Sequence, residues 1–75
     1  MMKVSGFLNI SYSGNLGVMK TRPGYASSIA YNIDNGGIEE ILGTISGNDT
    51  IFIAFKEPYD QEEMTRRMQN VISQM

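Results

Sequence analysis

The chain has 75 residues, a formal net charge of −2, and neither cysteine nor histidine. A domain of this size buries only about 60% of the surface that its unfolded chain exposes. Disulfides, thiolate metal sites and imidazole ligands are excluded as a supplement to the small core, so oligomerisation is the expected source of additional stability.

Charge and hydropathy also bear on possible partners. Six Lys plus Arg residues leave no basic stripe able to neutralise a run of phosphates, so we expect no nucleic-acid binding by this domain alone. No apolar run approaches the roughly 20 residues that span a bilayer. Met1-Met2-Lys3 leads directly into a predicted strand rather than a signal peptide. The sequence therefore predicts a cytoplasmic protein without a membrane partner.

The first predicted unit is a β-hairpin. Residues 7–12 alternate between the two faces of a strand, with Leu8, Ile10 and Tyr12 on one face. The Ser-Gly-Asn sequence at 13–15 has the residue types of a tight turn, and a second strand is predicted at 16–21.

A helix is predicted after this hairpin. Pro23 suits the first turn of a helix, where its missing N–H group costs no hydrogen bond, and Gly36-Gly37 is expected to end the helix. Tyr25 and Tyr31 lie off the apolar stripe, where half-buried packing is favoured over a contact with another subunit. The stripe has the i, i+3, i+4, i+7 spacing of one buried face and comprises Ala26, Ile29, Ala30 and Ile33.

A second hairpin and a second helix follow. Strands are predicted at 41–46 and 50–55, and Pro58 separates them from the last helix. Asp60 and Glu63 form an Asp-x-x-Glu signal for the start of that helix. Its apolar face is predicted to comprise Met64, Met68, Val71, Ile72 and Met75.

The order ββαββα indicates an α+β domain that occupies residues 1–75. We expect a two-layer sandwich, in which a four-stranded antiparallel sheet carries two helices on one face. Residues 51–55 are apolar on both faces, whereas a half-exposed strand should alternate. Ile51, Phe52 and Ile53 are therefore predicted to contact another subunit on the face that the helices leave open. The alternative is a strand that simply lies at the centre of the sheet.

A polar corner joins the last two strands. It comprises Gly47, Asn48, Asp49 and Thr50, residue types that tight turns select and that also present polar groups to a ligand. Composition alone favours the turn. Asp34 lies in the last predicted turn of the first helix, where the helix dipole disfavours an acid by up to about 1 kcal/mol, so its carboxylate is expected to have a compensating partner.

Two segments carry a joint pattern: Lys-Thr-Arg-Pro-Gly-Tyr-Ala at 20–26 and Gly-Thr-Ile-Ser-Gly-Asn-Asp-Thr at 43–50. Together they resemble the C-terminal domain of bacterial arginine repressors. The corresponding segments of that family read Lys-Thr-x-Pro-Gly-x-Ala and Gly-Thr-Ile-x-Gly-Asp-Asp-Thr. They have the same order and separation in this chain, and the resemblance covers nearly all of it.

The resemblance implies a function. Domains of that family form trimers that stack into a dimer of trimers, and L-arginine binds where the trimers meet. Family members bind operator DNA through an N-terminal winged helix-turn-helix domain, which is absent from this chain. The doubled Met1-Met2 is accordingly expected to be an added start on a fragment. No cofactor is expected besides the amino-acid ligand, and the implied binding residues are Ser27, Asp34, Gly47, Asn48, Asp49 and Thr50.

Two positions depart from the family pattern. Asn48 stands where the family usually has an acid that pairs with the guanidinium group, and Ser27 stands where a longer amide is common. Loss of one partner from a buried ion pair costs about 3–5 kcal/mol. Citrulline or another arginine-pathway metabolite is therefore an alternative ligand, because an amide can both donate to and accept from a neutral ureido group. A domain that assembles without a ligand is a further alternative.

An enzyme is not expected. The ββαββα order also occurs in pterin dehydratase-like proteins, but a fold carries no site by itself, and Asp34 and Asp49 alone would have to perform general acid–base catalysis.

The remaining charged residues are explained by solvent exposure. Lys20 and Arg22 are interpreted as a solvated rim, although they can also meet an anion or a neighbouring subunit. A solvent-exposed face with i,i+4 ion pairs explains Glu62, Glu63, Arg66 and Arg67.

Overall fold

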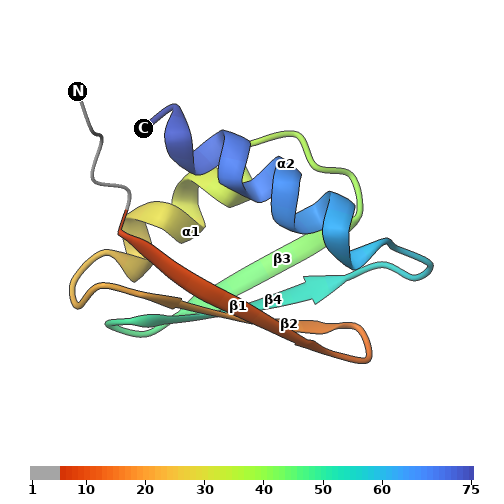
Figure 1. The fold of residues 1–75 in the computed structure, drawn as a ribbon, viewed down its shortest axis with the longest axis horizontal. Coiled ribbons are helices and arrows are strands. Elements are labelled where there is room, and N and C mark those ends of the chain that lie inside the picture. Colours follow the sequence, from red (N-terminus) through yellow and green to blue (C-terminus); the bar gives the residue numbers. More distant parts are fainter. Residues whose placement is uncertain (1–5) are drawn as a thin grey trace.

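The computed structural model describes residues 6–75 and confirms the predicted α+β architecture. A four-stranded antiparallel sheet carries two helices on one of its faces (Figure 1). The prediction for Met1-Met2-Lys3 lies outside the described residues. In chain order the elements are β1 (Phe7–Ser13), β2 (Leu16–Thr21), α1 (Ala26–Asp34), β3 (Ile41–Ser46), β4 (Thr50–Phe55) and α2 (Gln61–Ser73).

The strands lie in the order β1-β2-β4-β3, so the apolar strand β4 is central. Irregularities in pairing occur in both edge strands, between Phe7 and Asn9 in β1 and between Ile41 and Gly43 in β3. The first interrupts the predicted alternation. Ile10 and Tyr12 are partly buried as expected, but Leu8 lies in the irregular stretch and is 54% exposed. Leu8 therefore does not share their face, because a bulge changes the side on which a residue points.

The core lies between the inner face of the sheet and the two helices. All four residues of the predicted α1 stripe are buried, and α2 contributes Met64, Met68 and Ile72. Met75 was predicted to continue that face, but it is 43% exposed because α2 ends at Ser73. An aromatic cluster closes one end of the core, where the rings of Phe55 and Tyr59 stack with centroids 4.4 Å apart.

The start of α1 differs from the prediction. Pro23 lies in the preceding turn, and the helix begins at Ala26 with Tyr25 at the N-cap position. Gly24 has a φ angle of +87°, which is incompatible with a right-handed helix and therefore separates Pro23 from α1. The predicted end is confirmed, since α1 stops at Asp34, before Gly36-Gly37.

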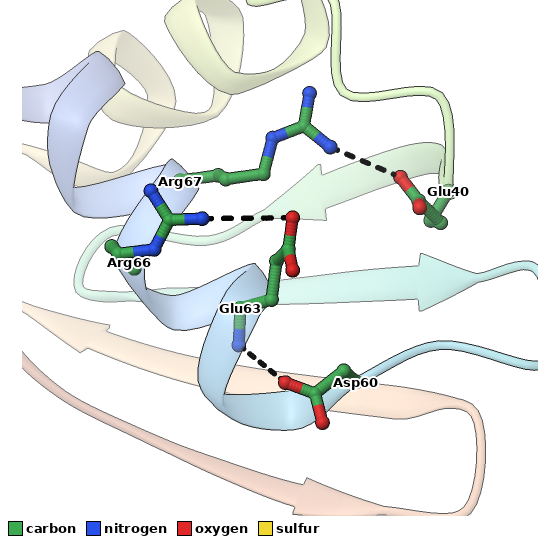
Figure 2. Close-up of polar contacts among 5 residues, drawn as sticks. All are labelled: Glu40, Asp60, Glu63, Arg66 and Arg67. Carbon is green, nitrogen blue, oxygen red and sulfur yellow. Dashed lines mark hydrogen bonds and ion pairs between the residues drawn. The ribbon is translucent and has the colours of Figure 1, made fainter.

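The start signal of α2 is confirmed. The carboxylate of Asp60 accepts a hydrogen bond of 2.8 Å from the Glu63 N–H group (Figure 2). The ion pairs differ from the predicted i,i+4 pairs, because Arg66 contacts Glu63 at 3.6 Å. Arg67 instead reaches Glu40, immediately before β3, at 3.4 Å (Figure 2). The contact between Arg67 and Glu40 therefore connects α2 to the segment that leads into β3.

Within residues 6–75, neither helix combines the length and the apolar character that crossing a lipid bilayer requires.

Candidate ligand site

The polar corner between β3 and β4 is held by main-chain hydrogen bonds. The Gly47 N–H group donates to the Thr50 carbonyl oxygen at 2.8 Å and closes the turn. The Asn48 carbonyl oxygen accepts from the N–H groups of Gly24 at 3.0 Å and Ala26 at 3.4 Å. The corner therefore docks on the segment between β2 and α1, which brings the two motifs of the sequence together.

This hydrogen bonding changes the role assigned to Gly47. Its N–H group is occupied by the Thr50 carbonyl oxygen and does not point to a ligand. The N-terminal turn of α1 offers donors instead, because the first N–H groups of a helix have no partner within the helix. No side chain of the described residues caps this end. Ser27, which follows Ala26 in that turn, therefore lies beside the Asn48 main chain and next to N–H groups suited to a carboxylate.

Asp49 and Thr50 connect the corner to β2. The Thr50 hydroxyl donates to Asp49 Oδ1 at 2.9 Å, and Lys20 Nζ donates to Thr50 Oγ1, also at 2.9 Å. The Asp49 carbonyl oxygen accepts from the Thr21 N–H group at 2.8 Å. Lys20 was interpreted as part of a solvated rim; it is exposed, but it has this defined contact.

Asp34 lies at the other end of α1. Its carboxylate accepts a shared hydrogen bond from the Thr44 hydroxyl, at 3.0 Å to each oxygen. This is the compensating partner that the sequence predicted, although Thr44 itself was not named in advance. Asp34 follows Ser27 by seven positions, so the two lie about 10 Å apart along the helix axis.

The predicted ligand groups are open to solvent in a single chain. Thr50 is partly buried, whereas the side chains that would contact the ligand are exposed: Ser27, Asp34, Asn48 and Asp49. A small-molecule site normally encloses most of its ligand. A second chain is therefore needed if these residues are to form an enclosed site.

The predicted interface residues divide between the two faces of β4. Ile51 and Ile53 are completely buried in the core, so they cannot contact another subunit as predicted. Phe52 points the other way and is 52% exposed. The reason is the alternation of side chains along a strand, which places only every second residue on the outer face.

Phe52 belongs to an apolar outer face of the sheet. It pairs with Val18 of β2 on one side and Ile45 of β3 on the other. Ile45 is 76% exposed, and a shallow groove formed by Ile45, Ser46, Gly47, Thr50 and Phe52 extends this surface to the polar corner. The sequence analysis missed Ile45, because only the pairing of β3 with β4 reveals which β3 residue lies beside Phe52.

The two tyrosines of α1 have different environments. Tyr25 is 41% exposed and its ring covers Gly6, where an added Cβ would meet the ring. Tyr31 is 69% exposed, so the prediction of half-buried packing is wrong for Tyr31 within one chain. The spacing of four and seven residues from Ser27 places Tyr31 and Asp34 on the same side of α1.

Comparison with known proteins identifies the family. Residues 4–70 match the family described as the arginine repressor, C-terminal domain. A protein named arginine repressor from Phocaeicola vulgatus is 58% identical over 57 residues, which are 76% of this chain and 36% of that protein. Another from Thermotoga maritima is 44% identical over 64 residues, 85% of this chain and 42% of the relative. The chain thus spans less than half the length of these relatives. It belongs to the family of arginine repressor C-terminal domains.

Proposed function

We propose that the domain binds L-arginine or a related amino acid between subunits and thereby strengthens the assembly of a transcription regulator of arginine metabolism. The observation that carries this proposal is the exposure of four side chains expected to contact the ligand, those of Ser27, Asp34, Asn48 and Asp49. On a single chain these groups cannot enclose a small molecule. Membership of the arginine repressor family supplies the ligand class.

The charges of the candidate site suit a cationic amino acid. Asp49 and Asp34 provide carboxylates for the α-ammonium and guanidinium groups, which bind carboxylates through charge-assisted hydrogen bonds. The N-terminal turn of α1 near Ser27 provides N–H groups for the ligand carboxylate. Because Asp34 and Ser27 lie on the same side of α1, we assign them to one side of the ligand and the corner of another subunit to the other side.

The outer face of the sheet supports the assembly part of the proposal. Phe52 and Ile45 expose large apolar side chains on a surface that continues to the polar corner. Exposed apolar patches of this kind mark interaction surfaces, and a small domain gains stability by covering them with a second copy. A ligand that contacts two chains binds the assembled form better, so it shifts the equilibrium toward assembly.

In this proposal the assembly is a hexamer made of two trimers, as the family resemblance implies. Binding of operator DNA belongs to a winged helix-turn-helix domain outside the matched region, because this domain has only six basic residues and a net charge of −2. The proposal assigns no catalytic activity to the domain. Within residues 6–75, no group of three carboxylates is placed to hold a metal ion.

A second candidate ligand is favoured by Asn48. Its side-chain amide is exposed and makes no hydrogen bond to another residue of the range 6–75. An amide offers both a donor and an acceptor, which suits the neutral ureido group of citrulline better than a guanidinium group. The alternative function is therefore a sensor of citrulline or another arginine-pathway metabolite.

Calorimetry with L-arginine, L-citrulline and L-ornithine tests both candidates. We expect saturable binding of L-arginine, or of L-citrulline in the second case, and a loss of at least about tenfold in affinity for Asp49→Asn, because a charge-assisted contact contributes about 1.5–3 kcal/mol. Glu62→Gln is the matched control, since it removes an exposed carboxylate on α2 and should leave the affinity unchanged. Absence of binding by all three amino acids would leave assembly as the only proposed role.

A further inference from the structure

Lys20 and Thr50 form a directed chain of hydrogen bonds that ends on the carboxylate of Asp49. They are opposite each other in the antiparallel pair of β2 and β4. An ammonium group only donates hydrogen bonds, so the Thr50 oxygen accepts from Lys20 and its hydrogen is left for Asp49. The distances of 2.9 Å for both contacts fit this direction.

The main chain of Asp49 is fixed as well. Its carbonyl oxygen accepts from the Thr21 N–H group at 2.8 Å, which holds the corner against the end of β2. With the backbone held there and Oδ1 held by Thr50, the carboxylate retains one defined direction. Residues 6–75 provide no donor to Oδ2 or to the second lone pair of Oδ1, so these acceptors are left for a donor from the ligand.

We propose that Lys20 and Thr50 are positioning residues, which hold the Asp49 carboxylate in one rotamer in advance of an amino-acid ligand. The ligand contact itself rests on the proposed function above. An exposed aspartate without these contacts would sample several staggered rotamers, and a ligand would then have to order it on binding. The hydrogen-bond chain removes that cost before the ligand arrives.

A purely electrostatic role for Lys20 predicts the opposite effect. A positive charge close to Asp49 repels a cationic ligand, so removal of the charge would strengthen binding. Removal of a positioning residue weakens binding instead. The direction of the change in affinity therefore separates the two roles.

The test measures the affinity for L-arginine by calorimetry in the 75-residue chain. We expect about three- to tenfold weaker binding for both Lys20→Met and Thr50→Val, the range that corresponds to ordering one side chain. The double variant should bind about as weakly as Thr50→Val alone, because Lys20 acts through Thr50. Thr50→Ser should rescue binding, since serine restores the hydroxyl group.

Lys56→Met is the matched control for the loss of one positive charge. Lys56 is exposed and follows β4 at the end opposite to Thr50, so its removal should leave the affinity unchanged. Unchanged or tighter binding by Lys20→Met, or additive losses in the double variant, would overturn the proposal.

A second readout does not require a ligand. Three-bond NMR couplings report the χ1 angle of Asp49, and we expect one rotamer in the parent chain and in Thr50→Ser but averaging in Lys20→Met and Thr50→Val. If the parent chain shows one rotamer but binds no amino acid, the proposed function fails while the positioning role stands. If Asp49 averages in the parent chain, the positioning role fails whatever the ligand results are.

Discussion

At the scale of single residues, two polar groups of the candidate site depend on tertiary partners. Asp34 is unfavourable at the C-terminal end of a helix, and the Thr44 hydroxyl compensates its carboxylate. The Asp49 carboxylate accepts from the Thr50 hydroxyl, which in turn accepts from Lys20 of β2. The family resemblance named both acids as candidate ligand residues, and that assignment stays a prediction. Their partners Thr44 and Lys20 were not foreseen, because a contact between different elements leaves no local periodicity.

Tyr12 provides a residue-scale prediction that concerns stability. Burial raises the pKa of the Tyr12 hydroxyl above its ordinary value of 10.0; the hydrogen bond with Thr65 acts in the opposite direction, and the nearby Tyr59 adds to the increase. The folded state therefore retains this proton at pH values where the unfolded chain has lost it. The stability that this difference contributes is complete below pH 10 and is lost as the pH rises through the folded-state value.

The measurement is the free energy of unfolding in urea between pH 8 and pH 11, for the parent chain and for Tyr12→Phe. We expect stability to decrease above about pH 10 in the parent chain and to decrease less in Tyr12→Phe. At pH 8 the variant should be about 1 kcal/mol less stable, since it lacks the 2.6 Å hydrogen bond to Thr65. Identical pH profiles of the two proteins would show that Tyr12 has no such role.

At the scale of elements, the sequence correctly predicted the features that depend on residues of a single element. The start of α2 followed from Asp60 and Glu63, and the buried stripe of α1 followed from its spacing. The start of α1 did not follow from Pro23, because the positive φ angle of Gly24 and the docking of this segment on Asn48 decide it. The irregularities in β1 and β3 also depend on partner strands, which explains the wrong face assigned to Leu8.

The N-cap of α2 gives the element-scale prediction. Asp60→Ala removes the acceptor for the Glu63 N–H group, and we expect a loss of about 1 kcal/mol in the free energy of unfolding. Asp60→Asn keeps a side-chain oxygen at the cap and should lose much less. Urea denaturation followed by circular dichroism measures both. Equal losses in the two variants would show that the negative charge, rather than the hydrogen bond, supports this helix end.

At the scale of the whole molecule, a single chain leaves two surfaces uncovered. The outer face of the sheet exposes Phe52 and Ile45, and the candidate ligand groups around Asp49 are open to solvent. The prediction of a subunit interface at Ile51 and Ile53 was wrong because both face the helices. The two apolar faces of β4 have different roles in a single chain. Ile51 and Ile53 build the core, whereas Phe52 lies on the uncovered outer face of the sheet.

Sedimentation velocity of the 75-residue chain, with and without L-arginine, tests most directly whether subunits complete the ligand site. We predict species larger than the 8.3 kDa monomer, and a shift to faster sedimentation when L-arginine is added. Phe52→Glu should sediment as a folded monomer, whereas Met75→Glu, which alters an exposed apolar residue beyond α2, should assemble like the parent chain. A parent chain that remains an 8.3 kDa monomer at tens of micromolar, both with and without L-arginine, would contradict the account.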